Sequence, residues 1–124
     1  MRIYKTKEFA RFARSEAVPD DRLCEAARRA ERGLIDADLG GGLIKQRVAR
    51  QGQGRSRGFR TLLAFRNEER AVFVYGFAKS ERDNIRDDEL RHWRKLAIVF
   101  LEATPAELER LIEADELMEV LDDG

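Results

Sequence analysis

The chain has very little of several residues on which common classes of site depend. Its 124 residues include one cysteine, Cys24, and one histidine, His92. These counts exclude a disulfide framework within the chain and a multi-cysteine zinc site, and they argue against a histidine metal site or a Ser-His-Asp triad. No apolar run reaches the roughly 18 residues of a membrane helix, and the N-terminus lacks a signal-peptide core. We therefore expect one soluble, cytoplasmic domain, residues 1–124, with no membrane or metal partner.

Charge, in contrast, is abundant and unevenly distributed. The formal net charge is zero, but residues 101–124 carry nine acids and one base. The first 100 residues therefore have a surplus of eight positive charges, and residues 39–67 contain seven bases and no acid. Such a basic stretch is either a solvated surface or a site for an anionic partner, of which a nucleic-acid backbone is the simplest. The acidic C-terminal extension, residues 101–124, either shields that stretch or keeps the protein soluble.

Two helices are predicted near the N-terminus, after a short strand at residues 2–5. Thr6 is a suitable N-cap for the first helix. The second helix is expected to begin with Pro19 as its first helical residue. Its apolar face is expected to extend as far as Leu34. This part of the sequence is typical of a helical hairpin.

The middle of the chain has the pattern of a sheet, and helices follow it. Strands are predicted at Leu43–Ala49, Phe59–Arg66 and Ala71–Ala78, and their short connections indicate an antiparallel meander. Helical periodicity returns near Asp87, and a capping box with proline at the first helical position opens a last helix after Thr104. We therefore expect an α+β fold, with an N-terminal helical hairpin and C-terminal helices packed on a small, mainly antiparallel sheet.

Five basic side chains are expected to converge on one concave face of this sheet. They are Lys45 and Arg47 on the first meander strand, Arg60 on the second, and Lys79 and Arg82 at and beyond the end of the third. Because neighbouring strands lie about 4.8 Å apart, such a cluster can hold a phosphate and stabilise charge that develops during phosphoryl transfer. In RNA cleavage by a 2′-hydroxyl, a lysine crowded by other cations can act as the base, because neighbouring positive charges lower its pKa.

Other candidate residues are better explained by structure. Tyr75 could assist catalysis, but its apolar strand favours a place in the core. His92 is expected at the surface of a charged helix, and Cys24 is expected to be buried or half-buried, with no sign of activation. Glu89, like two acids before it at 81 and 83, could cap a helix or pair with an arginine, and capping is the favoured role.

Four separated motifs in the right order resemble the RelE/HigB branch of the RelE/ParE toxin superfamily, the toxins of type II toxin–antitoxin modules. They are LIKQRVAR at 43–50, GQGRS at 52–56, GFRT at 58–61 and FAKSERDNI at 77–85. The resemblance implies a microbial-ribonuclease-like fold that cleaves mRNA, commonly in the ribosomal A site, without a metal or other cofactor. It also implies inhibition of translation and a cognate antitoxin, which in this branch is usually a helix-turn-helix protein.

The resemblance also assigns roles to individual residues. Lys45, Arg60 and Lys79 are implied to be catalytic, with Arg60 holding the scissile phosphate and the lysines supplying base or charge. The remaining cations are expected to contact RNA: Arg47, Arg50, Arg55, Arg57 and Arg82. The chain departs from the best-known RelE members at Ser80, where they have arginine, and at Arg86, where they have tyrosine. The stacking and leaving-group roles of those members therefore have no corresponding residue here, and Arg57 stands where relatives often have glycine.

Two other functions remain open at this point. ParE-type relatives share the fold but bind DNA gyrase and do not cut RNA, and a degenerate toxin would bind only RNA or its antitoxin. The basic residues taken together favour the nuclease, because a gyrase binder does not need a convergent phosphate site. Replacing Arg60 with alanine is expected to abolish cleavage with the fold intact, because Arg60 is expected on the solvent side of its strand.

Overall fold

The structure of the protein is a computed structural model that describes residues 1–49, 58–78 and 85–121. Its strands and helices follow one another along the chain as β1 (Arg2–Thr6), α1 (Lys7–Ser15), α2 (Asp20–Glu31), β2 (Ala37–Gly40), β3 (Leu43–Val48), β4 (Phe59–Arg66), β5 (Arg70–Ala78), α3 (Asp87–Glu102), α4 (Pro105–Glu113) and β6 (Leu117–Glu119).

The six strands form one open sheet in the order β2-β3-β4-β5-β1-β6. Strands β2, β3, β4 and β5 pair antiparallel in sequence order, so the predicted meander is confirmed. β1 pairs parallel with β5, and β6 pairs antiparallel with β1 at the far edge. β5 thus lies inside the sheet, which explains why its sequence is apolar on both faces.

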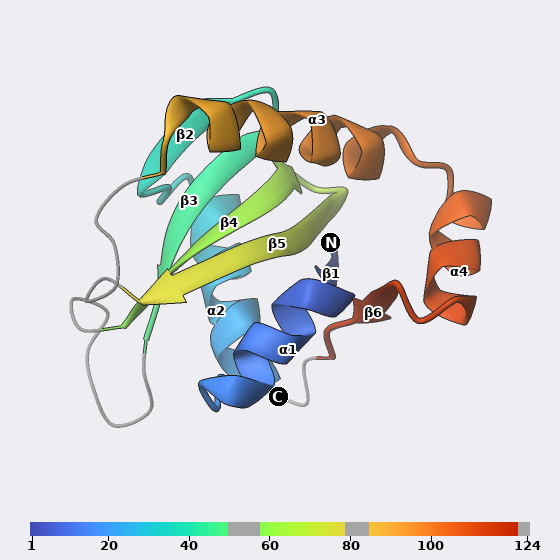
Figure 1. Ribbon diagram of the computed structural model, residues 1–124, viewed down its shortest axis with the longest axis horizontal. Helices are drawn as coiled ribbons and strands as arrows, with labels where there is room; N and C mark the ends of the chain where they lie inside the picture. Colours follow the sequence, from blue (N-terminus) through green and yellow to red (C-terminus); the bar gives the residue numbers. More distant parts are fainter. Residues whose placement is uncertain (50–57, 79–84, 122–124) are drawn as a thin grey trace.

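Helices cover both faces of the sheet (Figure 1). On one face α1 and α2 pack against alternate residues of the meander, including Ile44, Phe59 and Phe73. On the other face α3 packs against residues of opposite parity, such as Leu43 and Leu62, and α4 lies beside β6 at the edge of the same apolar cluster. The predicted α+β fold is confirmed, and the alternation assigns each meander side chain to one of the two helical layers.

The N-terminal helices follow the sequence signals with one difference at each end of α2. Thr6 caps α1 by accepting a hydrogen bond from the Phe9 amide at 3.1 Å. The sequence predicted Pro19 as the first helical residue of α2, but Pro19 is the N-cap of this helix. The helix ends at Glu31, and Gly33 then turns the chain with φ +81°. Leu34 therefore leaves the apolar face and is 56% exposed, so its predicted place on that face is wrong.

Strand β2 has no counterpart among the strands predicted from the sequence. It is four residues long, lies at the edge of the sheet, and is joined to β3 by a turn in which Gly40, Gly41 and Gly42 all have positive φ. The turn is also crowded, because a Cβ on Gly42 would lie 2.4 Å from a side-chain carbon of Leu101. The three glycines, which the sequence indicated only as a break in the chain, are thus the tight connection of a hairpin.

The C-terminus of α3 is held by two arginines of the β4–β5 hairpin. The last turn of α3 has no basic residue of its own. Arg70 donates from Nη1 to the carbonyls of Phe100 and Ala103 at 2.9 and 2.7 Å, and Arg66 donates to the carbonyl of Leu101 at 3.0 Å. These bonds satisfy carbonyls that lack a partner within the helix.

Replacing Arg70 with methionine will therefore lower the free energy of unfolding by about 2 kcal/mol, since hydrogen bonds to charged groups contribute about 1.5–3 kcal/mol. Urea denaturation followed by circular dichroism measures this change. Arg91→Met, at an exposed position of the same helix, is the matched control and should change stability by less than about 0.5 kcal/mol. Equal stability of the two variants would show that the hairpin arginines do not cap α3.

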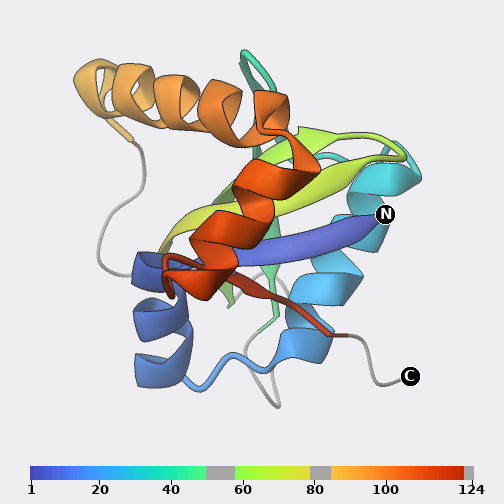
Figure 2. The same ribbon diagram turned by 90° about the vertical axis from the view of Figure 1, so that its right-hand side faces the viewer.

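The acidic extension lies away from the basic strands. Its described part, residues 101–121, comprises the end of α3, all of α4 and strand β6, and β6 lies at the sheet edge opposite β2 and β3. Figure 2 shows α4 and β6 together on the side of β1. This part of the extension therefore does not shield the basic face of β3 and β4.

No helix among the described residues is both long and apolar enough to cross a membrane.

Candidate functional site: a cationic face on strands β3 and β4

Three of the predicted cations lie on the α3 side of the sheet, and we call Lys45, Arg47 and Arg60 the cationic face. Lys45 and Arg47 alternate with Ile44 and Val48, which pack toward α1 and α2. Arg60 alternates with Phe59, which also packs toward that layer. Arg47 and Arg60 are direct cross-strand partners, so the predicted convergence of these residues on one face agrees with the strand register.

The pairing of Arg47 with Arg60 brings their side chains close. The amide of Arg47 donates to Asp36, and its carbonyl accepts from Arg29, so both backbone groups are bonded on the β2 side of β3. The N–H and C=O of one strand residue point the same way, and the Arg47–Arg60 pair is therefore of the non-hydrogen-bonded kind. In such antiparallel pairs the Cα atoms lie about 4.5 Å apart and the side chains are closer than in the other kind.

Arg60 is buried, which corrects the expectation that it lies on the solvent side of its strand. It is 8% exposed, and its Nη1 atom is buried with no hydrogen-bond partner in the part of the chain that the structure describes. Burial lowers the pKa of Arg60, and the positive charge of Arg47 lowers it further, while Asp36 acts in the opposite direction. A buried guanidinium with an unused donor beside a second guanidinium is an arrangement suited to an anion.

Gly58 and Phe59 determine where Arg60 lies. A Cβ on Gly58 would lie 1.9 Å from the carbonyl oxygen of Val48 in β3, so only glycine permits this approach of the two strands. Phe59 is 1% exposed, pairs with Val48, and packs its ring edge-on against Phe12 at 5.4 Å. With Phe59 fixed in one layer, alternation directs Arg60 to the opposite face. The Gly-aromatic-Arg motif thus has a structural explanation.

Aromatic side chains border the cationic face on β5 and α3. Arg60 pairs with Phe77 and Leu62 pairs with Tyr75, and a β-bulge between Leu62 and Leu63 shifts the register of β5. Tyr75 is half-buried and stacks on Trp93 of α3, with ring centroids 4.9 Å apart. This packing agrees with the structural role that the sequence favoured for Tyr75.

The other five predicted site residues lie outside the described part of the chain: Lys79, Arg50, Arg55, Arg57 and Arg82. Ser80 and the acids at 81 and 83 also lie outside it. Arg86 is described and is the exposed residue before α3, where its Nε lies 3.2 Å from Asp88. Glu89 accepts a hydrogen bond from the Arg86 amide at 3.4 Å, so its predicted capping role is confirmed. Cys24 is buried, as predicted.

Arg29 and Asp36, the two residues that bond the backbone of Arg47, were missed by the sequence analysis. Arg29 is 4% exposed and lies on α2, and Asp36 precedes β2. With Leu34, Ile35 and Arg47 they line a cavity of about 330 Å³. A buried arginine on an alanine-rich helix face was the available signal, but no spacing in the sequence links positions 29, 36 and 47.

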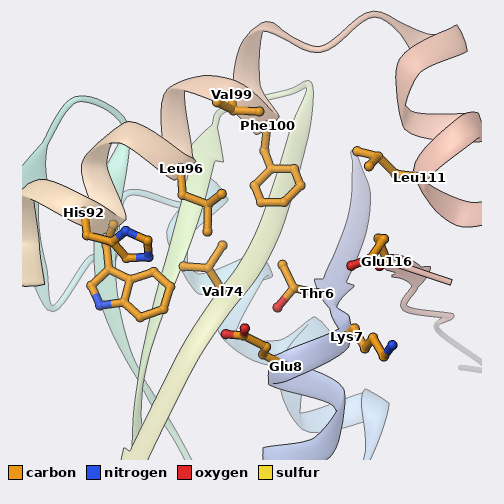
Figure 3. Close-up of a pocket in the computed structure, with 11 residues that line it drawn as sticks. Thr6, Lys7, Glu8, Val74, His92, Leu96, Val99, Phe100, Leu111 and Glu116 are labelled. Atoms are coloured by element: carbon orange, nitrogen blue, oxygen red, sulfur yellow. The ribbon is translucent and has the colours of Figure 1, made fainter. Parts of the chain in front are cut away.

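A separate apolar cavity of about 380 Å³ lies between α3, α1 and α4. Figure 3 shows Val74, Leu96 and Phe100 directed into it, with Glu8 and His92 at its margin. His92 is exposed, as predicted, and its ring lies edge-on to Trp93. None of the three residues of the cationic face lines this cavity, and no group of three or more metal-ligating side chains occurs in the described ranges.

The α+β fold, with one sheet between two helical layers, is consistent with the toxin fold that the sequence resembles. A family model agrees: the one described as the RelE toxin of the RelE/RelB toxin–antitoxin system matches residues 1–120. The chain therefore belongs to the RelE toxin family, as the resemblance had suggested. No curated protein matches the chain.

Proposed function

We propose that this RelE-family protein is an mRNA endoribonuclease that inhibits translation. The observation that carries the proposal is the pairing of Arg47 with a buried Arg60 whose Nη1 has no partner in the described part of the chain. Like charges directly opposite each other on a sheet are destabilising, and a buried polar group that lacks a hydrogen-bond partner costs free energy. A bound phosphate removes both costs, so phosphate binding explains the Arg47–Arg60 pair better than a purely structural role does.

The proposed reaction is an attack of a 2′-hydroxyl on the neighbouring phosphate of the RNA chain. A base removes the hydroxyl proton, the bond from the 2′-oxygen to phosphorus forms, and the bond from phosphorus to the 5′-oxygen breaks. The leaving oxygen takes up a proton, so the products are a cyclic phosphate and a 5′-hydroxyl end. Arg60 holds the scissile phosphate and stabilises its developing charge, Lys45 and Lys79 supply base or charge, and the reaction needs no metal.

The other cations and the partners complete the proposal. Arg47 and Arg82 contact the phosphates that flank the scissile one, and the arginines at 50, 55 and 57 extend this contact along the RNA. The substrate is mRNA on the ribosome. A cognate antitoxin, of the helix-turn-helix type that is usual in the HigB branch, neutralises the toxin by covering the cationic face.

Inducible expression in a bacterial host, with mapping of new 5′-hydroxyl ends in cellular mRNA, tests the proposal. We expect growth arrest and new ends at codon positions with the wild type, and neither with Arg60→Ala. Growth arrest with intact mRNA would contradict the nuclease proposal and would indicate a ParE-like inhibitor of gyrase or of another protein. Absence of arrest with soluble, folded protein would indicate a degenerate module that binds only RNA or its antitoxin.

A further inference from the structure

Arg29 and Asp36 hold the backbone of Arg47 on the β2 side of β3, at a point along the strand that β2 itself does not reach. We propose that these two side chains, which we call the Arg29–Asp36 clamp, are positioning residues that keep Arg47 beside Arg60 for contact with RNA. The inference rests on the proposed function and adds to it two residues that do not themselves touch the phosphate.

The clamp takes the place of a missing strand. β2 pairs with β3 only as far as Ala37, which lies opposite Lys45. At Arg47, two residues further along β3, the Asp36 carboxylate accepts the amide N–H at 2.6 Å and the Arg29 guanidinium donates to the carbonyl. Two side chains thus satisfy the backbone groups that a longer β2 would have paired.

The clamp is itself fixed in place. Arg29 projects from α2, is 4% exposed, and donates from Nε to Glu25 at 2.9 Å. Its Nη1 lies 3.8 Å from the Oδ2 of Asp36, the same oxygen that binds the Arg47 amide. A guanidinium presents its donors in a rigid planar fork, so the helix, the carboxylate and the strand are held at fixed relative positions.

Arg47 needs such support because of its neighbour. Mutual repulsion favours separation of the Arg47 and Arg60 side chains while no anion is bound, and an edge-strand end without backbone partners opens easily. Holding both backbone groups of Arg47 prevents that end of β3 from moving away from β4. The cationic face is then already arranged when RNA arrives, and binding does not have to order it.

A double-mutant cycle tests whether the clamp acts through Arg47. Asp36→Ala, Arg47→Ala and the double variant are compared for the Kd of a single-stranded RNA oligonucleotide and for the cleavage rate at saturating mRNA on ribosomes. We expect Asp36→Ala to weaken RNA binding about tenfold, the size of one lost charge-assisted contact, with little change in the saturated rate. The double variant should bind no more weakly than Arg47→Ala, because a positioning residue has no effect once its target is gone.

Two further variants separate positioning from folding. Asp36→Asn keeps an oxygen that can accept from the Arg47 amide and should retain most of the affinity, even if Asp36→Ala folds poorly. Asp38→Ala is the matched control, because Asp38 is an exposed carboxylate of the same segment that bonds only Gly40 among the described residues, at 2.9 Å. Thermal denaturation gives the folded fraction of each variant.

The outcomes of this experiment distinguish the two proposals. Additive losses in the cycle, or an Asp36→Ala variant that binds RNA as Asp38→Ala does, would overturn the clamp while leaving the nuclease proposal intact. A wild type that binds RNA but does not cut would overturn the nuclease proposal, and the cycle in Kd would still support or refute the clamp. A wild type that does not bind RNA would overturn both.

Discussion

Arg60→Met will reduce RNA cleavage by about 100- to 1,000-fold, the range for removal of one donor that stabilises developing negative charge. The scissile phosphate gains charge in the transition state, and the Nη1 of Arg60, which has no hydrogen-bond partner among the described residues, is a donor already held in a buried place. Methionine has a similar length and no charge, so the variant removes the donor without opening a large cavity. The loss should appear in the rate at saturating RNA as well as in RNA affinity.

The free energy of unfolding of the same variant should be higher than that of the wild type by about 0 to 1 kcal/mol. The side chain of Arg60 is almost fully buried, and it lies opposite Arg47. Replacing a buried charge by an apolar side chain is often neutral or stabilising, and a like-charge pair across a sheet costs about 0.2–1 kcal/mol. A substitution that lowers activity without lowering stability is typical of a residue that serves the functional site and not the fold.

Urea denaturation and cleavage assays on the same preparations measure both effects. Arg11→Met is the control, because Arg11 is exposed on α1, which packs on the other face of the sheet. The control should keep wild-type cleavage and stability. A folded Arg60→Met variant that cuts RNA at the wild-type rate would refute the role given to Arg60. A variant that loses several kcal/mol would show that the guanidinium supports the fold.

Much of this architecture could be predicted because it depends on local sequence. The period of two places Lys45 and Arg47 on one face of β3, and the N-cap at Thr104 with Glu107 three residues later determines the start of α4, where both capping hydrogen bonds form at 3.1 Å. The same alternation correctly predicted that Arg60 and Phe59 lie on opposite faces of the sheet. These features need only a few consecutive residues, and tertiary packing did not alter them.

The features that the sequence did not reveal depend on contacts between distant residues. Arg60 lies on a central strand between Arg47 of β3 and Phe77 of β5, and neither neighbour is close to it in the sequence. β2 is short and has Asp38 and Gly40 among its four residues, both poor strand formers. The Arg29–Asp36 clamp joins a helix, a loop and a strand, and no periodicity in the sequence marks such a combination.

The strongest local signal for the site is Gly58, and its replacement by alanine is expected to be the most damaging to the fold. The added Cβ would lie 1.9 Å from the Val48 carbonyl oxygen and 2.9 Å from its carbonyl carbon, and both are backbone atoms that cannot rotate away. β4 must then move away from β3 at the Val48–Phe59 pair, one residue before Arg60. We expect a loss of more than about 3 kcal/mol, at the upper end of overpacking costs, and cleavage reduced beyond the loss of folded protein.

Gly33→Ala provides the comparison that isolates steric overlap from backbone conformation. Gly33 has φ +81° but no atom within 4 Å of its added Cβ, so alanine there should cost only about 1 kcal/mol of left-handed strain. Chemical denaturation of both variants, with cleavage normalised to the folded fraction, measures the two effects. Similar stability losses at the two positions would mean that β3 and β4 do not approach as closely as described. A larger loss at Gly58, with reduced cleavage per folded molecule, would show that this glycine controls the separation of the strands that carry Arg47 and Arg60.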